Sequence, residues 1–311
     1  MRMISPLPLT GREVRDACLP TMNPGPVKDR ILRDLSSIEA EEDALYDAAS
    51  RRALRSLAPA QFMPVVSRDM KKFYENRLRD SAPGGRIWRA ILDIGGLRCP
   101  FCHIAVPRTV EHSFPQSRYP RLTVEPLNLV PACRDCNFER NVGHGSITVS
   151  PYFDNWVADV PWLRAEVVDI AEPHDLRFYP ERHRSFADDQ WAALQQFVDD
   201  VDLARRYVDP AIQEFEGFAA TLRLVDPHPT ATVVKLALED KIASSESAYG
   251  HNRWQTAAYH AWLGVADLVD WSTAGTPPPV VVHRAYPLAA PLSAIASRTP
   301  PRPQMNGVRF P

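Results

Sequence analysis

The chain has 311 residues, of which 45% are hydrophobic and 24% are charged, and its formal net charge is -2. These are ordinary globular values, which exclude a wholly disordered chain and a protein that is basic over its entire surface. The length favours two domains. The sequence has no signal-peptide segment and no apolar run long enough to span a bilayer, so a soluble cytoplasmic protein without a membrane partner is expected.

The N-terminal region predicts an irregular arm followed by helices. Residues 1–26 are rich in proline, which favours irregular structure. Apolar residues recur at helical spacing over 27–57 and again over 67–79, and the second of these helices is basic. A short helix is predicted over 87–94. Lys and Arg outnumber Asp and Glu from 51 to 145, whereas acidic residues are in excess elsewhere, so positive charge is concentrated near the middle of the chain.

The remainder of the chain predicts a helical region with an acidic surface and then a tail. Strands are predicted over 165–170 and 176–179, and helices over 188–224, 232–244 and 254–271. Prolines are frequent over 276–311 and predict a tail without regular structure.

Four of the five cysteines form two Cys-x-x-Cys pairs, Cys99 with Cys102 and Cys133 with Cys136. Two intervening residues let both sulfurs of a turn reach one ion, and a site of four thiolates stabilises a segment too small to form its own core. In a reducing compartment this spacing favours a structural zinc over disulfides. Buried or redox thiols, and a c-type haem attachment that Cys99 to His103 would also match, are the less favoured alternatives.

The cysteine pairs enclose residues with a different chemistry. Glu111 offers the oxygen donor that Mg2+ and Mn2+ prefer, and His112 can take a proton from water near neutral pH. Asn128 can hold their loop through local hydrogen bonds, and Asn137 directly follows the last cysteine, so a bound zinc would fix its position. Arg140 lies about one helical turn further on and can meet a phosphate. Taken singly, Glu111 and His112 are also explained as an exposed polar pair, and Asn128 and Asn137 are also explained as ordinary residues of turns.

This combination resembles the four-cysteine branch of the HNH endonucleases, which have the ββα-metal fold. The resemblance covers residues 97–154 and rests on Cys-x-x-Cys, Glu-His with a nearby proline, Asn-Leu and Cys-x-x-Cys-Asn in this order. It implies that His112 is the general base and that Glu111 and Asn137 bind one catalytic Mg2+ or Mn2+. It also implies that Asn128 orients the base loop and that the cysteines bind a structural Zn2+. Glu111 replaces the usual Asp, and Asn137 stands where many members have His, which leaves the preferred metal open.

The resemblance implies a DNA endonuclease that hydrolyses phosphodiester bonds. The candidates for DNA contacts are Arg140, Arg118, Lys71 and Lys72, with His144 as a weaker one. Nucleases of this kind occur in restriction and phage-defence systems, and the long flanks suggest a protein partner such as an ATPase or a sensor. The alternative is a zinc module that binds nucleic acid or protein without catalysis, which would leave Glu111, His112 and Asn137 unexplained.

These observations together predict a mainly α fold that carries a small ββα-metal module. Four segments are expected. Residues 1–80 form an N-terminal arm and a basic helical region, and 81–155 form the nuclease module with its structural zinc. Residues 156–275 form the acidic helical domain, and 276–311 form the proline-rich tail.

Overall fold

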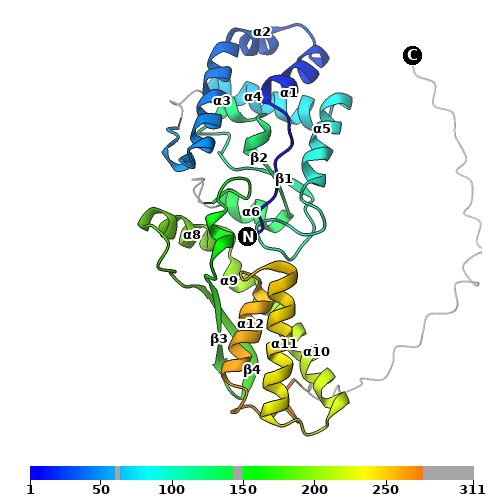
Figure 1. Cartoon of the computed structure of the whole chain (residues 1–311). Helices are drawn as coiled ribbons and strands as arrows, with labels where there is room; N and C mark the ends of the chain where they lie inside the picture. The colour runs from blue at the N-terminus through cyan, green and yellow to red at the C-terminus, as the bar shows by residue number, and fades with distance from the viewer. Residues whose placement is uncertain (60–63, 143–148, 276–311) are drawn as a thin grey trace, which may run out of the picture. The chain divides into compact units, whose positions relative to one another are not determined.

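The computed structural model describes residues 1–59, 64–142 and 149–275 (Figure 1). The chain divides into two compact units, 1–275 and 276–311. The second unit, which is the predicted tail, and His144 lie outside the described residues. The described part is mainly helical and contains two antiparallel sheets of two strands each, which confirms the predicted fold class. The segment limits expected inside 1–275 stay predictions.

The chain begins with three helices, of which the first lies where an irregular arm is predicted. They are α1 (Gly11–Cys18), α2 (Pro26–Arg33) and α3 (Leu35–Ser50). Helix α1 forms despite the nearby prolines because the Thr10 and Glu13 side chains cap each other's backbone amides at its start. Val14 and Cys18, four residues apart on one face, are fully buried. The capping pair was the sequence signal for this helix.

The basic helix predicted over 67–79 is confirmed, with a change of winding inside it. Helix α4 (Pro64–Phe73) continues into a π-helical turn, Tyr74–Arg79. Met70, Phe73 and Leu78 are buried, so this unit packs through its apolar stripe. Helix α5 (Ala82–Asp93) follows, and the Ser81 side chain caps it by accepting a hydrogen bond from the Gly84 amide.

The cysteine segment folds as strand, loop, strand and helix. Strands β1 (Thr109–His112) and β2 (Leu129–Ala132) pair antiparallel, with Glu111 opposite Val130 and His112 opposite Leu129. Helix α6 (Arg134–Val142) follows β2 directly and packs against β1. The loop between the strands contains two short 3-10 helices, Pro120–Leu122 and Pro126–Asn128.

The later part of unit 1–275 is a β-hairpin packed with helices (Figure 1). Its elements are α7 (Trp156–Asp159), β3 (Leu163–Asp169), β4 (Glu172–Pro180), α8 (Asp188–Asp200), α9 (Leu203–Arg206), α10 (Val208–Val225), α11 (Ala231–Tyr249) and α12 (Trp254–Gly264). The two predicted strands are confirmed and pair with each other. Helix α12 packs on β3 and α11, while α10 packs on β4. Helix α12 ends at Gly264 rather than at Trp271, whose buried indole instead donates to the Ala266 carbonyl.

The cysteine segment shares a hydrophobic core with the later helices. One continuous cluster of buried side chains includes Cys99, Phe101 and Phe197 and continues to Trp271.

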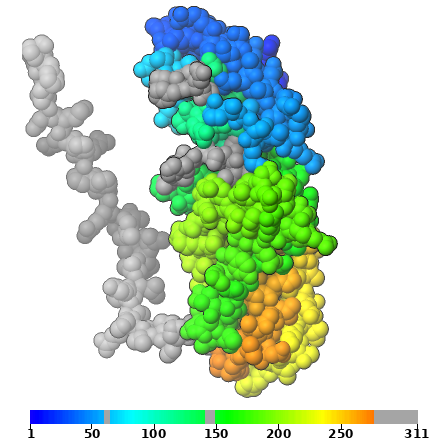
Figure 2. Space-filling view, turned by 90° about the vertical axis from the view of Figure 1, so that its left-hand side faces the viewer, coloured from blue at the N-terminus to red at the C-terminus, as the bar shows by residue number. Residues whose placement is uncertain are grey.

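Ion pairs join Arg55 to Asp154 and Asp189, and the blue N-terminal region and the green segment adjoin on the surface (Figure 2). Within the described ranges, no helix is both long enough and apolar enough to cross a bilayer.

Candidate functional site

The four paired cysteines meet in one buried cluster. Cys99 and Cys102 come from the turn before β1, while Cys133 and Cys136 come from the junction of β2 and α6. All four sulfurs lie within 4.8 Å of one another, and those of Cys102 and Cys133 are 3.8 Å apart. Tetrahedral zinc with Zn–S bonds of about 2.3 Å separates its sulfurs by about 3.8 Å. The cluster is therefore suited to a metal ion such as zinc, as the spacing predicted.

Hydrogen-bond donors surround these sulfurs. The backbone amide of Cys133 donates to Cys99 Sγ at 3.3 Å, and that of Cys136 donates to Cys133 Sγ at 3.4 Å. Arg206 of α9 places its guanidinium 2.9 Å from Cys136 Sγ and 3.5 Å from Cys133 Sγ, and also pairs with Asp135. A cation here balances part of the negative charge of four thiolates. Arg206 could not be found from the sequence, because it is distant along the chain from the cysteines and lies in an unrelated helix.

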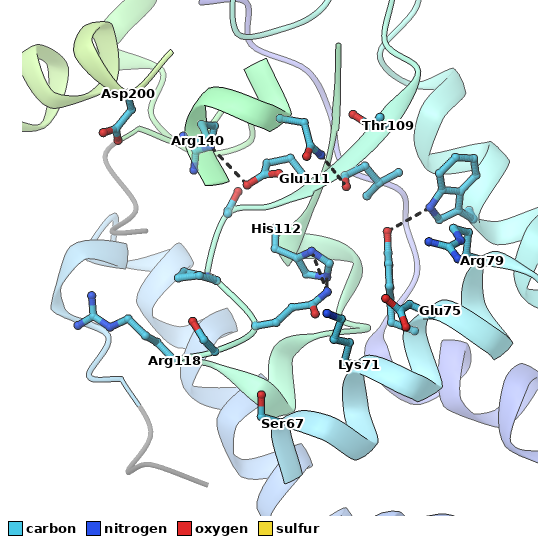
Figure 3. A pocket seen from close by; sticks show the side chains of 18 residues that line it. Ser67, Lys71, Glu75, Arg79, Thr109, Glu111, His112, Arg118, Arg140 and Asp200 are labelled. Carbon is cyan, nitrogen blue, oxygen red and sulfur yellow. Dashed lines mark hydrogen bonds and ion pairs between the residues drawn. The ribbon is translucent and has the colours of Figure 1, made fainter. Parts of the chain in front are cut away.

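A polar cavity of about 870 Å³ lies against β1 and α6. It is bounded by β1 and the loop that follows it, by α6, by α5, and by α4 with its π-helical turn (Figure 3). Six of the residues singled out from the sequence line it, namely Glu111, His112, Asn137, Arg140, Arg118 and Lys71. Lys72 is exposed and Asn128 is buried, and neither lines the cavity.

Glu111 is a buried carboxylate with one nearby cation. Only 8% of the residue is exposed, and its Oε1 lies 3.7 Å from Arg140 Nε. Burial raises the pKa of Glu111 to about 7, and the positive charge of Arg140 opposes this rise. The distance to Arg140 is longer than a hydrogen bond, so the carboxylate is paired but not tightly held.

His112 is held by a backbone carbonyl and faces a side-chain amide. Its Nε2 lies 2.9 Å from the carbonyl oxygen of Thr123, and Gln116 Nε2 lies 3.0 Å from the same ring nitrogen and 3.2 Å from Nδ1. Burial lowers the pKa of His112 to about 4, so the ring is neutral at pH 7. A neutral imidazole has one ring hydrogen, and the carbonyl contact assigns it to Nε2. The lone pair is then on Nδ1, and the ring also meets Tyr74 edge-on at 4.8 Å.

Asn128 forms hydrogen bonds to two parts of the loop that follows His112. Its Nδ2 donates to the carbonyl oxygens of Phe114 and Leu122 at 3.0 and 2.9 Å, and its Oδ1 accepts from the Phe114 amide. The side chain is fully buried, so all of these bonds are protected from water. Asn128 thus acts on the loop and not on the cavity.

Asn137 and Arg140 project from α6 toward β1. Asn137 Nδ2 donates to the Val110 carbonyl oxygen at 3.3 Å, which places its amide beside the Glu111 strand. Arg140 is 8% exposed and stacks over the Phe101 ring at 5.1 Å, with its side chain directed toward Glu111 (Figure 3). Its Nε and Nη1 have no hydrogen-bond acceptor among the described residues. A buried guanidinium with unused donors is suited to an incoming anion.

Several cavity residues were not found from the sequence. Tyr74 belongs to the apolar stripe of its helix, which indicates packing and not a site, and Gln116 lies in a loop where no periodic pattern applies. Arg79, from the end of the π-helical turn, also lines the cavity. A π-helical turn rotates the following side chains relative to an α-helix, so helical spacing alone misplaces Arg79.

Comparison with known proteins gives one partial similarity. Protein ea31 of Escherichia phage lambda is 33% identical over 147 residues, which are 44% of this chain and 49% of that protein. The chain thus spans about half the length of the curated relative it matches. No family model matches the chain, and no solved structure does so either.

Proposed function

We propose that the protein is a metal-dependent endonuclease of the HNH type that hydrolyses phosphodiester bonds of DNA. The observation that carries this proposal is the meeting of Glu111, His112 and Asn137 in one polar cavity, beside a separate four-cysteine cluster. A carboxylate, a neutral imidazole and an amide with a buried arginine nearby are the groups that phosphodiester hydrolysis needs.

His112 is the proposed general base. The carbonyl of Thr123 fixes the ring hydrogen on Nε2 and leaves the lone pair of Nδ1 to take a proton from water. Gln116 Nε2 lies within hydrogen-bond distance of Nδ1, where it can yield to that water. The low pKa of His112 keeps the base unprotonated at neutral pH. The fixed tautomer and the closed loop together orient the base before substrate arrives.

Glu111 and Asn137 are the proposed ligands of Mg2+ or Mn2+. Both are oxygen donors and both line the same cavity, and Arg140 Nε lies 3.7 Å from the Glu111 carboxylate, so the donor set fits a hard divalent ion. When bound, such an ion supplies charge neutralisation at the scissile phosphate and at the leaving oxygen. The cysteine cluster has thiolate donors only and is the proposed site of structural Zn2+.

Basic side chains around the cavity are proposed to hold the phosphate backbone. Arg140 brings unused donors into the cavity beside Glu111. Lys71 and Arg118 are exposed at its edge, and no acceptor for either is present among the described residues. Lys72 is exposed on α4 and does not line the cavity, so only a contact with flanking DNA is proposed for it. These cations predict binding that weakens as salt concentration rises.

The test is incubation of zinc-loaded protein with supercoiled plasmid, linear DNA and RNA, with Mg2+, with Mn2+ and without added divalent ion. Cleavage of DNA that requires an added ion is expected. Cleavage of RNA alone would change the substrate, and the absence of cleavage of any polymer with either ion would contradict the proposal. Retained DNA binding without cleavage would favour the alternative, a non-catalytic zinc module that binds nucleic acid or protein.

We also propose that this nuclease works in phage defence or restriction with a protein partner, such as an ATPase or a sensor. An apolar groove of about 530 Å³ between α10 and α11, lined by Phe218, Val225 and Val233, offers a docking surface. Val225→Asp is expected to reduce co-purification of the partner from native cells, whereas Val168→Asp, at an exposed position on β3, is the matched control. A protein that purifies alone from those cells and cuts unaided would contradict this role.

A further inference from the structure

One buried carboxylate ties the loop beside His112 to the N-terminal helices. Glu125 is fully buried in the loop between β1 and β2. Its carboxylate accepts hydrogen bonds from the Gly11 amide of α1 at 2.8 Å and from the Tyr46 hydroxyl of α3 at 3.0 Å. It also accepts from the Leu127 amide at 3.2 Å. Donors from three parts of the chain therefore converge on one side chain.

Glu125 lies between the two contacts that this loop makes with the base segment. Two residues before it, the Thr123 carbonyl accepts the hydrogen of His112 Nε2. Three residues after it, Asn128 bonds both the amide and the carbonyl of Phe114. The Glu125 backbone takes part as well, because its carbonyl accepts from the Asn128 amide at 2.9 Å. A displacement of Glu125 would thus move both contacts together.

The fit of α1 against this carboxylate is close. A methyl group at Gly11 would collide with the carboxylates of both Glu125 and Glu42. Glu42 is itself buried and paired with Arg15 of α1. The N-terminal helices therefore contact this loop directly, with the two carboxylates packed against the start of α1.

We propose that Glu125 is a positioning residue through which α1 and α3 hold the Thr123 carbonyl and thereby set the tautomer and orientation of His112. The effect on cleavage rests on the proposed nuclease function, whereas the effect on the ring does not. Without the anchor, the loop is free to shift, the ring hydrogen is no longer confined to Nε2, and the base is misplaced. Substrate affinity is kept, because Lys71 and Arg140 lie on other elements.

Two variants remove the anchor in different ways. Tyr46→Phe deletes a single hydroxyl, and Glu125→Gln keeps the volume but turns an amide group toward the donors. Tyr259→Phe is the matched control, since its hydroxyl also donates to a carboxylate, that of Glu214, but between α12 and α10. Glu125→Asp keeps the charge and is expected to rescue part of the effect of Glu125→Gln.

The experiment measures the 15N resonances of the His112 ring in zinc-loaded protein, together with kcat and KM for plasmid cleavage. Glu125→Gln and Tyr46→Phe are expected to shift the ring from one tautomer toward a mixture and to lower kcat by about ten- to a hundredfold, with KM nearly unchanged. Tyr259→Phe should change neither. An unchanged ring signature in folded Glu125→Gln would overturn the proposal, as would an equal loss in Tyr259→Phe. If the wild type does not cleave DNA, the nuclease function fails, and the ring signature still decides the role of Glu125.

Discussion

The four-cysteine cluster and the polar cavity both take residues from α6, yet they are built in opposite ways. The cluster takes its four sulfurs from two tight turns, and donors surround them. The cavity takes residues from α4, α5, β1, α6 and α8. It contains the buried guanidinium of Arg140, two of whose nitrogens have no acceptor among the described residues, and the buried carboxylate of Glu111, whose pKa is raised. Satisfied groups stabilise a fold, whereas unsatisfied groups are available for binding and chemistry.

The largest effect is expected from breaking the cluster. Cys133→Ser removes one of four sulfurs, and the segment around β1, β2 and α6 should lose its bound metal and its cooperative unfolding, because structural zinc contributes about 10 kcal/mol or more in small modules. Metal content and thermal unfolding followed by circular dichroism measure this. Cys18→Ser, at a lone buried cysteine, is the control and should keep the metal. A Cys133→Ser protein with unchanged metal content and melting temperature would show that the cluster is not a structural site.

Glu111→Gln separates function from stability in the cavity. DNA cleavage is expected to fall about a hundredfold or more, because the proposed metal loses a charged ligand. The free energy of unfolding of the variant should instead rise relative to that of the wild type as pH rises. The folded-state pKa of Glu111 is raised from 4.5 to about 7, so its contribution to the free energy of unfolding is full below pH 4.5 and is lost as pH rises through 7.

The Gln variant cannot ionise and does not lose this contribution. Relative to the wild type it should therefore gain about 2 kcal/mol between pH 5 and pH 8, measured by urea unfolding without added Mg2+. A difference between the two proteins that does not vary with pH would show that Glu111 is not buried as described.

Arg206→Met tests whether charge from α9 supports the cluster. The guanidinium contacts the sulfurs of Cys136 and Cys133, so its removal should weaken zinc binding by about tenfold in competition with a chelator. Arg205→Met is the neighbouring control, because Arg205 is exposed and pairs only locally with Asp202. Equal zinc affinities in the two variants would mean that the sulfurs do not depend on this cation.

The smallest effect is expected at the edge of the cavity. Lys71→Ala should weaken DNA binding by a few fold and reduce its dependence on salt, since one phosphate contact is lost. Lys72→Ala is a closely matched comparison, with the same side chain one residue further and outside the cavity. Fluorescence anisotropy over a range of salt concentrations compares them. A larger loss in Lys72→Ala would place the DNA on the outer side of α4.

The cluster could be predicted from the sequence because its geometry is local. Two Cys-x-x-Cys turns determine where the sulfurs of each pair lie, and the fold needs only to bring the two turns together. The adjacency of Glu111 and His112 and the position of Asn137 after Cys136 are local in the same sense. Helices α2 to α5 and α8 to α12 followed from their apolar periodicity, whereas α1 and α7 did not.

The rest of the site depends on contacts between distant segments. Arg206 reaches the sulfurs from a helix 70 residues further along the chain than Cys136. The Thr123 carbonyl that holds His112 is a backbone group, and no residue type marks it. Glu125 lies in a loop, where a glutamate is an ordinary residue. Its role can be recognised only from the hydrogen bonds that Gly11 and Tyr46 donate to it. Tertiary packing determines such contacts, and one sequence has no pattern for them.

We propose that a structural metal site and a separate reaction cavity lie side by side, with His112 as the base of the cavity. The most direct measurement is the rate of plasmid cleavage with Mg2+ by His112→Ala, with zinc content determined on the same sample and His260→Ala, an exposed histidine of α12, as the control. We expect a loss of about a hundredfold or more in His112→Ala alone, with unchanged zinc content. Cleavage by His112→Ala at the wild-type rate would contradict it.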